Sequence, residues 1–205
     1  MPVRSHNQQN ILKRNLDLSV PSPPAWVAAV MADFDAFLQD HADCERKASG
    51  FAMSMVAKYP DRTAIIPELI ETALEEMEHF KLVYAVMAAR GVSLAHVIPK
   101  DEYIERLMKL RRTGREEHFL DRLCIGSVVE SRGAERFRLV EEALADPALK
   151  TFYKMLWTSE AKHGNLYVDM ALRYFPEKEV YERLAWFNEQ EGAIVQGLEI
   201  RAALH

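Results

Sequence analysis

Two short stretches of the chain each carry a glutamate and a histidine three residues apart. They are Glu76-Met-Glu-His79 and Glu160-Ala-Lys-His163. On an α-helix, residues three apart lie on the same face, so each pair could direct a carboxylate and an imidazole toward one point. A single pair of this kind is a weak signal, because Glu and His are common on solvated helix faces. Because the pattern occurs twice, the residues that precede each pair decide whether the two pairs belong to one metal site.

A further glutamate precedes each pair at nearly the same distance. Glu45 lies 31 residues before Glu76, and Glu130 lies 30 residues before Glu160. This order is typical of two helical hairpins, each with a Glu on its first helix and Glu-x-x-His on its second. Four Glu and two His in this arrangement are the ligand set of the carboxylate-bridged dimetal centres of four-helix bundles. Carboxylates combined with imidazoles suit iron or manganese.

The elements that must position these residues are helices. Apolar periodicity and turn signals predict an all-α fold, with one domain over residues 1–205, and no segment has the alternation of a strand. The chain is expected to divide into an extended arm at 1–21, a bundle core at 24–175 and an appended helix at 177–201. The expected long helices span 24–58, 63–90, 116–144 and 147–174, and a short accessory helix spans 101–112. Pro67 predicts a later or kinked start for the second helix.

Each long helix carries an apolar stripe with alternating steps of three and four residues. A carboxylate interrupts every stripe near its middle, and an imidazole follows in two of them. Burying an unpaired carboxylate costs several kcal/mol, whereas a whole domain is stable by only about 5–15 kcal/mol. No Lys or Arg lies on the stripes at these levels. Metal binding is therefore the best explanation for Glu45, Glu76, His79, Glu130, Glu160 and His163.

Several neighbouring residues compete with these candidates or assist them. Glu135 is the rival of Glu130, but it lies five residues on, about 140° around the helix, and so leaves the stripe. Glu75 and Glu78 flank Glu76 on other faces, where solvent or a contact with a ligand residue is expected. His41 lies one turn before Glu45 and is a candidate hydrogen-bond partner for it. An ordinary buried histidine is an equally good interpretation of His41.

The composition places few limits on the class of protein. Apolar residues make up 49% and charged residues 28% of the 205 residues, as in ordinary globular proteins. No run of apolar residues is long enough to span a membrane, and residues 1–10 lack the apolar core of a signal peptide. Cys44 and Cys124 have no metal-binding or disulfide spacing, which favours a reducing cytoplasm.

The charge distribution bears on nucleic-acid binding. The net charge of −5 argues against a protein that coats nucleic acid along its whole surface. The densest basic cluster is a candidate contact for tRNA phosphates. A competing interpretation is that these cations offset the dipole at a helix C-terminus. The cluster consists of Lys109, Arg111, Arg112 and Arg115.

The sequence resembles the ferritin-like di-iron family. Within that family it is most similar to the tRNA hydroxylases that act on methylthio-isopentenyl-adenosine beside the anticodon. The resemblance covers about residues 24–175, and it rests on His41-Ala-Asp-Cys-Glu45, Glu75-Glu76-Met-Glu-His79-Phe80, Glu130-Ser-Arg-Gly-Ala-Glu135-Arg-Phe137 and Ser159-Glu160-Ala-Lys-His163.

The resemblance implies a ferritin-like four-helix bundle and an O2-dependent monooxygenase. It implies two iron ions, with manganese as a possible substitute, held by the six Glu and His residues named above. The reaction would hydroxylate the isopentenyl side chain of the modified adenosine in tRNA. Two electrons would come from an external donor or reductase, because the chain shows no flavin, haem or iron–sulfur motif.

The leading alternative is a ferritin-like ferroxidase or iron-handling protein, which would share the ligand set. The arm, the short helix and the last helix favour a monomeric or dimeric enzyme over the shell of a storage protein. A structural bundle without metal is the third possibility. Metal analysis separates it from the other two.

Overall fold

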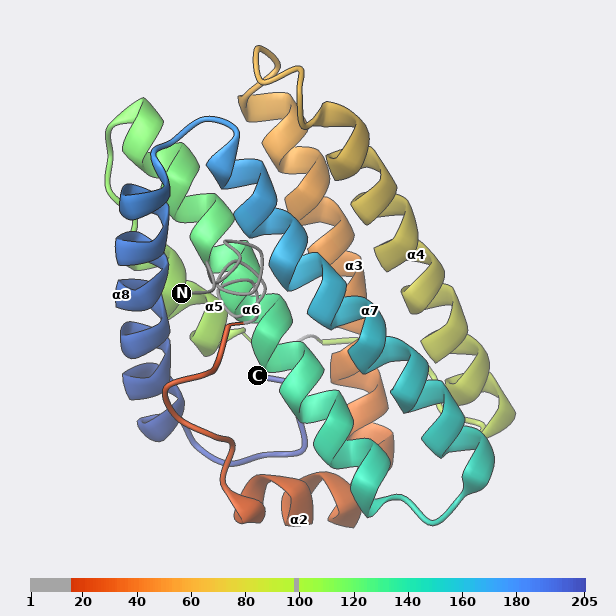
Figure 1. Cartoon of the computed structure of the whole chain (residues 1–205). Helices are drawn as coiled ribbons and strands as arrows, with labels where there is room; N and C mark the ends of the chain where they lie inside the picture. Colours follow the sequence, from red (N-terminus) through yellow and green to blue (C-terminus); the bar gives the residue numbers. More distant parts are fainter. Residues whose placement is uncertain (1–15, 98–99) are drawn as a thin grey trace, which may run out of the picture.

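The computed structural model describes residues 16–97 and 100–205, and within these ranges the chain forms helices and no strand. Four long helices make two antiparallel hairpins that lie side by side (Figure 1). The predicted all-α four-helix bundle is confirmed. The first hairpin pairs α3 (Phe34–Lys58) with α4 (Ile66–Ala89), and the second pairs α6 (Arg115–Ala143) with α7 (Pro147–Leu172).

The first expected helix, 24–58, is divided in two by Asp33. The structure has a short helix α2 (Pro24–Ala32) and then α3. Asp33 leaves the helical region, with φ −141° and ψ 69°, and its side chain accepts a hydrogen bond from the Ala36 amide. Asp competes for backbone donors in this way and is a preferred residue at helix starts. The continuous helix was a wrong prediction, because the apolar pattern runs across the break.

The other helix ends differ from expectation by smaller amounts. Pro67 lies in the first turn of α4, which starts at Ile66 instead of 63. The short accessory helix is α5 (Glu102–Lys109), with Asp101 as its N-cap. The last helix, α8 (Glu177–Gln196), ends five residues before the expected 201, and Gly197 follows it. Residues 197–205, here called the C-terminal tail, fold back toward α2 and α3 (Figure 1).

The buried apolar residues form layers on both sides of the polar middle of the bundle. One layer holds the C-terminal half of α3 and the start of α4, with Met55 and Leu69 fully or almost fully buried. The opposite layer holds the start of α3 and the start of α7, with Phe37 and Tyr153 fully buried. The apolar seams therefore stabilise the bundle from both ends, and the charged residues between them are held at fixed positions.

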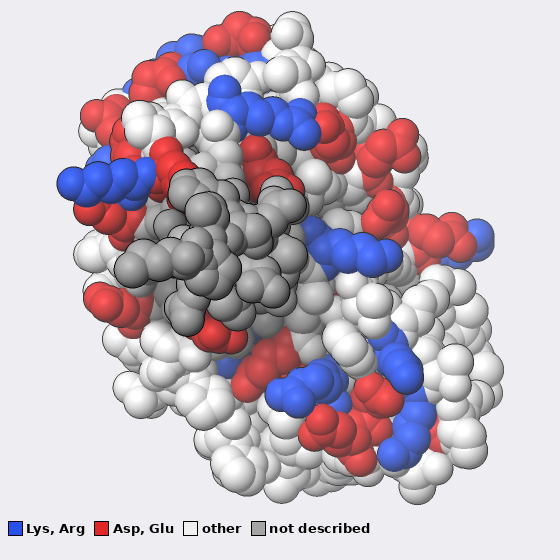
Figure 2. Space-filling view, in the orientation of Figure 1, with Lys and Arg blue, Asp and Glu red and all other residues white. Residues whose placement is uncertain are grey.

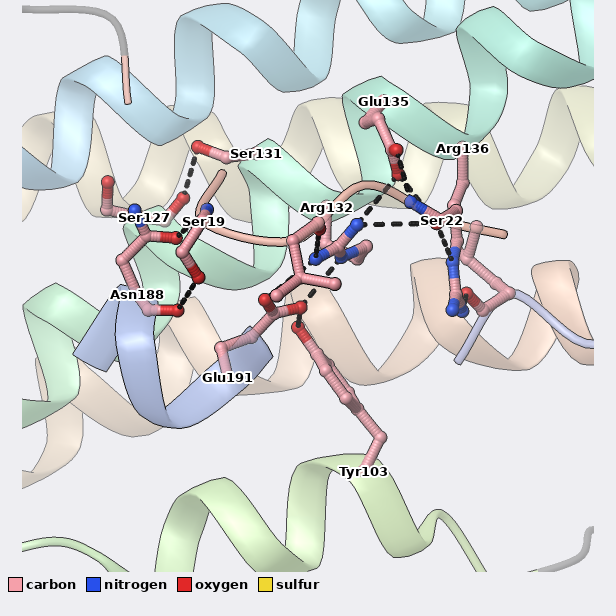
Figure 3. A network of polar contacts seen from close by, with 12 residues as sticks. Ser19, Ser22, Tyr103, Ser127, Ser131, Arg132, Glu135, Arg136, Asn188 and Glu191 are labelled. Carbon is pink, nitrogen blue, oxygen red and sulfur yellow. Dashed lines mark hydrogen bonds and ion pairs between the residues drawn. The ribbon is translucent and has the colours of Figure 1, made fainter. Parts of the chain in front are cut away.

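A buried polar network fastens the accessory segments to α6 (Figure 3). Arg132 is fully buried and donates to both carboxylate oxygens of Glu191 on α8, at 2.7 and 2.8 Å. Tyr103 on α5 donates to the same carboxylate, and Ser22 of the N-terminal segment donates to Glu135. The network joins three segments that sequence periodicity treats as separate. Residues 1–15 of the expected arm lie outside the described residues.

Acidic and basic side chains lie close to one another on the face of the molecule shown in Figure 2. Figure 2 shows them interspersed over the face that presents α6, α7 and α8, with no broad field of one sign. Among the described helices, none is both long and apolar enough to cross a membrane.

Candidate metal centre

The four long helices bring the six predicted Glu and His side chains to one place in the middle of the bundle. Their ligand atoms form two overlapping groups, within each of which all atoms lie within 4.8 Å of one another. Glu76 and Glu160 belong to both groups, as bridging carboxylates would. The first group is completed by Glu45 and His79, and the second by Glu130 and His163.

The imidazoles direct the same ring nitrogen at the shared carboxylates. Nδ1 of His163 lies 2.7 Å from Glu76 Oε1 and 3.7 Å from Glu160 Oε2. Nδ1 of His79 lies 3.3 Å from Glu76 Oε2 and 3.5 Å from Glu160 Oε1. The matching geometry at the two ends follows from the repeated Glu-x-x-His on α4 and α7. It makes the site nearly symmetrical.

Several atoms of this cluster have no hydrogen bond of acceptable geometry within the described part of the chain, although they are buried. They are Glu76 Oε1, both carboxylate oxygens of Glu160, and His163 Nδ1. Buried polar atoms without partners are costly, and native proteins satisfy almost all of them. Oxygen and imidazole donors aimed at a common point are what a pair of hard divalent ions requires. The residues therefore fit two iron ions, whose charge four carboxylates would balance.

Burial and the short distances between charged groups shift the pKa values of the clustered side chains. Burial raises the pKa of the Glu45 and Glu130 carboxyls well above their usual range. Burial also disfavours the charged form of the imidazoles, but the close approach of carboxylates raises the pKa of His79 to about 12 and that of His163 to about 11. Burial opposes the charge of Glu160 as well, yet the polar groups close to it hold its pKa well below the usual value.

His41 lies beside the cluster, where the sequence predicted it. Its Nε2 is 2.6 Å from Glu45 Oε1, and its Nδ1 is 3.2 Å from the Tyr153 hydroxyl. Burial lowers the pKa of His41 to about 3, so the ring is neutral. A neutral ring accepts at one nitrogen and donates from the other. The ring therefore joins the Tyr153 hydroxyl to the carboxyl group of Glu45, donating to one of them and accepting from the other.

The flanking glutamates have separate roles. Glu75 is exposed, yet its Oε2 lies 2.8 Å from His163 Nε2, so it holds the far side of that ring. Such a contact fixes the orientation of a metal-binding histidine. Glu78 pairs with Lys81 on the surface. Glu135, the rival of Glu130, accepts hydrogen bonds from Ser22 and pairs with Arg132 instead of entering the cluster.

An apolar cavity of about 120 Å³ opens onto the cluster from one side. All four candidate glutamates line it, together with the two small residues Ala48 and Gly133 that follow Glu45 and Glu130 by three positions. Sequence reasoning missed the residues at its entrance, Lys47, Asp101 and His205. The three lie on different elements, so no periodic signal could have brought them together.

The basic cluster proposed for tRNA contacts is largely engaged within the protein. Arg112 pairs with the buried Asp121 at 2.8 Å, and Arg115 pairs with Asp61 at 2.6 Å. Arg111 donates to the Met108 carbonyl. Lys109, with 70% of its side chain exposed, pairs with Glu105 at 3.1 Å. The assignment of this basic cluster as a tRNA contact stays a prediction.

Comparison with known families and proteins adds a second line of argument. Residues 9–205 match the model of the family described as tRNA-(MS[2]IO[6]A)-hydroxylase (MiaE). A Pseudomonas putida protein named tRNA 2-(methylsulfanyl)-N(6)-isopentenyladenosine(37) hydroxylase is 32% identical over 92% of this chain and 91% of its own length. A Salmonella typhimurium protein of the same name is 26% identical, over 87% and 83% of the two chains.

Among solved structures, the chain is similar to "Protein 43 with aldehyde deformylating oxygenase activity from Synechococcus". The TM-score is 0.87 at 33% identity, over 92% of this chain and 94% of that one. The family match, over residues 9–205, extends through all four bundle helices and so includes the six clustered residues.

Proposed function

The chain belongs to the tRNA-(MS[2]IO[6]A)-hydroxylase (MiaE) family, and we propose from this premise that it hydroxylates the isopentenyl side chain of 2-methylthio-N6-isopentenyladenosine in tRNA. It is a monooxygenase of the non-haem di-iron class. The observation that carries the proposal is the family match over residues 9–205, which spans every helix that contributes to the Glu and His cluster.

The six clustered residues are proposed to hold two iron ions, with manganese as the other metal that suits them. Bound iron would supply the activation of O2. In the overall reaction a C–H bond of the side chain is replaced by C–OH, and the second oxygen atom leaves as water. An external donor or reductase supplies the two electrons, and two protons are consumed.

The chain's own contribution is to hold the ligands and shape the space beside them. His41 and Tyr153 fix one carboxylate, Glu45, from behind, and Glu75 fixes the ring of His163. The apolar walls of the cavity exclude water from the side of the cluster that a substrate would reach. Together these contacts pre-organise the site, so little reorganisation is needed when a substrate side chain enters.

The proposed function also implies partners and a cellular location. The substrate is tRNA, as the names of the two curated relatives indicate. We propose a monomer or dimer that works in the cytoplasm and receives electrons from a separate protein. An iron-storage role receives less support, because the family match is to hydroxylases and the cavity beside the cluster is apolar.

The similarity to a protein with aldehyde deformylating oxygenase activity favours one second candidate function. A deformylase would need to bind an aldehyde with its carbon chain in the cavity. The cavity of about 120 Å³ suits a short chain. Supplying the iron-loaded protein with short and long aldehydes and measuring the hydrocarbon products decides this alternative.

Nucleoside analysis of tRNA tests the main proposal. Cells of the source organism with and without the gene are compared by mass spectrometry of digested tRNA. Loss of the hydroxylated nucleoside, with accumulation of its unhydroxylated form, is the expected result. An unchanged ratio of the two nucleosides would refute the proposed function.

A further inference from the structure

The cavity beside the cluster has a floor, walls and a mouth of different character. Its floor is made by the four glutamates, whose exposed fractions are between 1% and 7%. Its walls are apolar and come from α3, α5 and α6. They include Phe51, Met108, Ile125 and Phe137. Lys47, Asp101 and His205 also line the cavity, are partly exposed and form its polar side, here called the mouth.

The C-terminal tail closes one side of this cavity. Leu204 and His205 are the last two residues of the chain, and both line it. The tail is fixed by side chains of three helices. The Trp26 indole donates to the Ala203 carbonyl at 2.9 Å, the Leu204 amide donates to Asp40 Oδ2 at 2.7 Å, and Arg136 donates to the Leu204 carbonyl. Leu204 is therefore held in place as part of the wall.

His205 is held as firmly as Leu204. Its ring stacks on Tyr103 with centroids 4.5 Å apart and an interplanar angle of 9°. Its Nδ1 lies 3.8 Å from Cys44 Sγ. The Tyr103 hydroxyl donates a hydrogen bond to Glu191 in the network of Figure 3. The buried network on α6 therefore also positions the last residue of the chain.

The mouth is a poor site for another metal ion, although Cys44, Asp101 and His205 lie close enough together. The ammonium of Lys47 lies 2.8 Å from Asp101 Oδ2 and already provides the cation. Burial also raises the pKa of the Cys44 thiol well above its usual range, so it does not offer a thiolate. The mouth is better suited to hydrogen bonding with a polar ring.

The cavity's size limits what it can receive. An apolar protein cavity of roughly 150 Å³ binds benzene, so a cavity of about 120 Å³ accommodates a branched five-carbon chain. It is too small to take a purine ring as well. A substrate with an apolar side chain on a polar base would place the side chain against the apolar walls and leave the base at the mouth.

We propose that Leu204 and His205 are specificity-determining residues, with Leu204 limiting the size of the side chain that fits beside the cluster and His205 bordering the base. This inference rests on the proposed function for the identity of the base. The limit itself follows from the wall, because Leu204 is 4% exposed and packs in the same apolar layer as Phe137. Shortening Leu204 would enlarge the cavity without touching a candidate metal ligand.

The test uses anticodon stem-loop RNAs with three forms of one adenosine: unmodified, N6-isopentenyl and N6-geranyl, the last with a ten-carbon chain. Affinity for the metal-free protein is measured by fluorescence anisotropy, and hydroxylation by the iron-loaded protein is measured by mass spectrometry. The wild type is expected to prefer isopentenyl over geranyl by about tenfold or more. Leu204→Ala is expected to shift this preference toward geranyl by about tenfold in both assays. Leu204→Met, which keeps the volume, is expected to retain the wild-type preference.

Ile200→Ala is the matched control, because Ile200 lies in the same tail, is 46% exposed and does not line this cavity. It is expected to behave as the wild type. If Leu204→Ala and wild type show the same preference while both stay folded, the inference is overturned. If the wild type binds with the expected preference but forms no hydroxylated product, the proposed function fails and the inference on chain length stands.

Discussion

At the scale of single residues, the site depends on which carboxylates are buried within the bundle. Glu130 and Glu135 differ by five positions on one helix, and this difference sends them to different places. Glu130 is 7% exposed and lies within the cluster. Glu135 lies on the other side of α6, where it accepts a hydrogen bond from Ser22 and forms an ion pair with Arg132. Seam position was therefore sufficient to choose between them. For Glu75 it left open solvent or a contact with a ligand residue, and the structure shows both, since its carboxylate reaches His163 although its own side chain is 57% exposed.

Replacing each of these two glutamates with alanine in turn tests which of them binds the metal. Glu130→Ala should lower iron binding from two ions per chain to one or fewer, because one ligand group loses its separate carboxylate. Glu135→Ala should keep two ions but destabilise the fold by about 1–3 kcal/mol, since it removes the acceptor for the Ser22 amide and hydroxyl and one of the carboxylates that pair with Arg132. Anaerobic Fe(II) titration with elemental analysis, and urea unfolding, measure the two effects. Loss of iron in the Glu135 variant alone would reverse the assignment.

His41 offers a test of indirect support for the metal. His41→Ala removes the hydrogen-bond partner of Glu45, and metal affinity should fall about 10–100-fold. Tyr153→Phe should have a smaller effect in the same direction, because it removes only the hydroxyl that contacts the His41 ring. His118→Ala is a suitable control, as His118 contacts Tyr59 and Arg111. Equal affinities in the three variants would show that His41 only fills space.

At the scale of elements, the four seams were predictable because their period is repeated over many turns. The break at Asp33 was not, since one capping residue interrupts an unbroken apolar pattern. The path of residues 197–205 was not predictable either. This tail has no period, and its place is set by hydrogen bonds to Trp26, Asp40 and Arg136, which lie far away in the sequence. Local propensity does not carry such information.

Asp121 joins three elements and predicts a pH dependence of stability. It is fully buried and accepts hydrogen bonds from Arg112, after α5, and from Arg183 on α8. Burial opposes its charge, but hydrogen bonds from Arg183 and Arg112 outweigh burial and lower its pKa below 3.8. A lowered pKa contributes stability that is present above the unfolded value and is lost as pH falls through the folded value.

Asp121→Asn should therefore lower the free energy of unfolding by about 1.5–3 kcal/mol near neutral pH. The difference from wild type should shrink below about pH 4, where the wild-type carboxylate begins to take up its proton. Urea unfolding at several pH values measures it. A difference that stays constant down to pH 2 would show that the charge of Asp121 has no part in it.

Arg112→Ala should also lower the free energy of unfolding. This loss must be measured before any loss of tRNA binding is assigned to that residue.

At the scale of the whole molecule, the bundle supplies the ligands and the accessory segments enclose the space beside them. α5 and the C-terminal tail cover the cavity, while α8 and the N-terminal segment hold the tail and α5 through Arg132 and Glu191. The sequence predicted the bundle and the cluster, because both depend on periodicity. The cover could not be predicted, because it depends on contacts between segments more than 50 residues apart. Its residues distinguish this chain from a plain four-helix bundle.

The most direct test of the proposed function follows the oxygen atom. The iron-loaded protein is incubated with tRNA that carries the unhydroxylated nucleoside, a chemical electron donor and O2 labelled with heavy oxygen. We predict one heavy oxygen atom in the isopentenyl side chain of the product nucleoside, detected by mass spectrometry, and none without iron. Absence of the hydroxylated nucleoside from protein that holds two iron ions per chain, or oxygen derived from water instead of O2, would contradict the account.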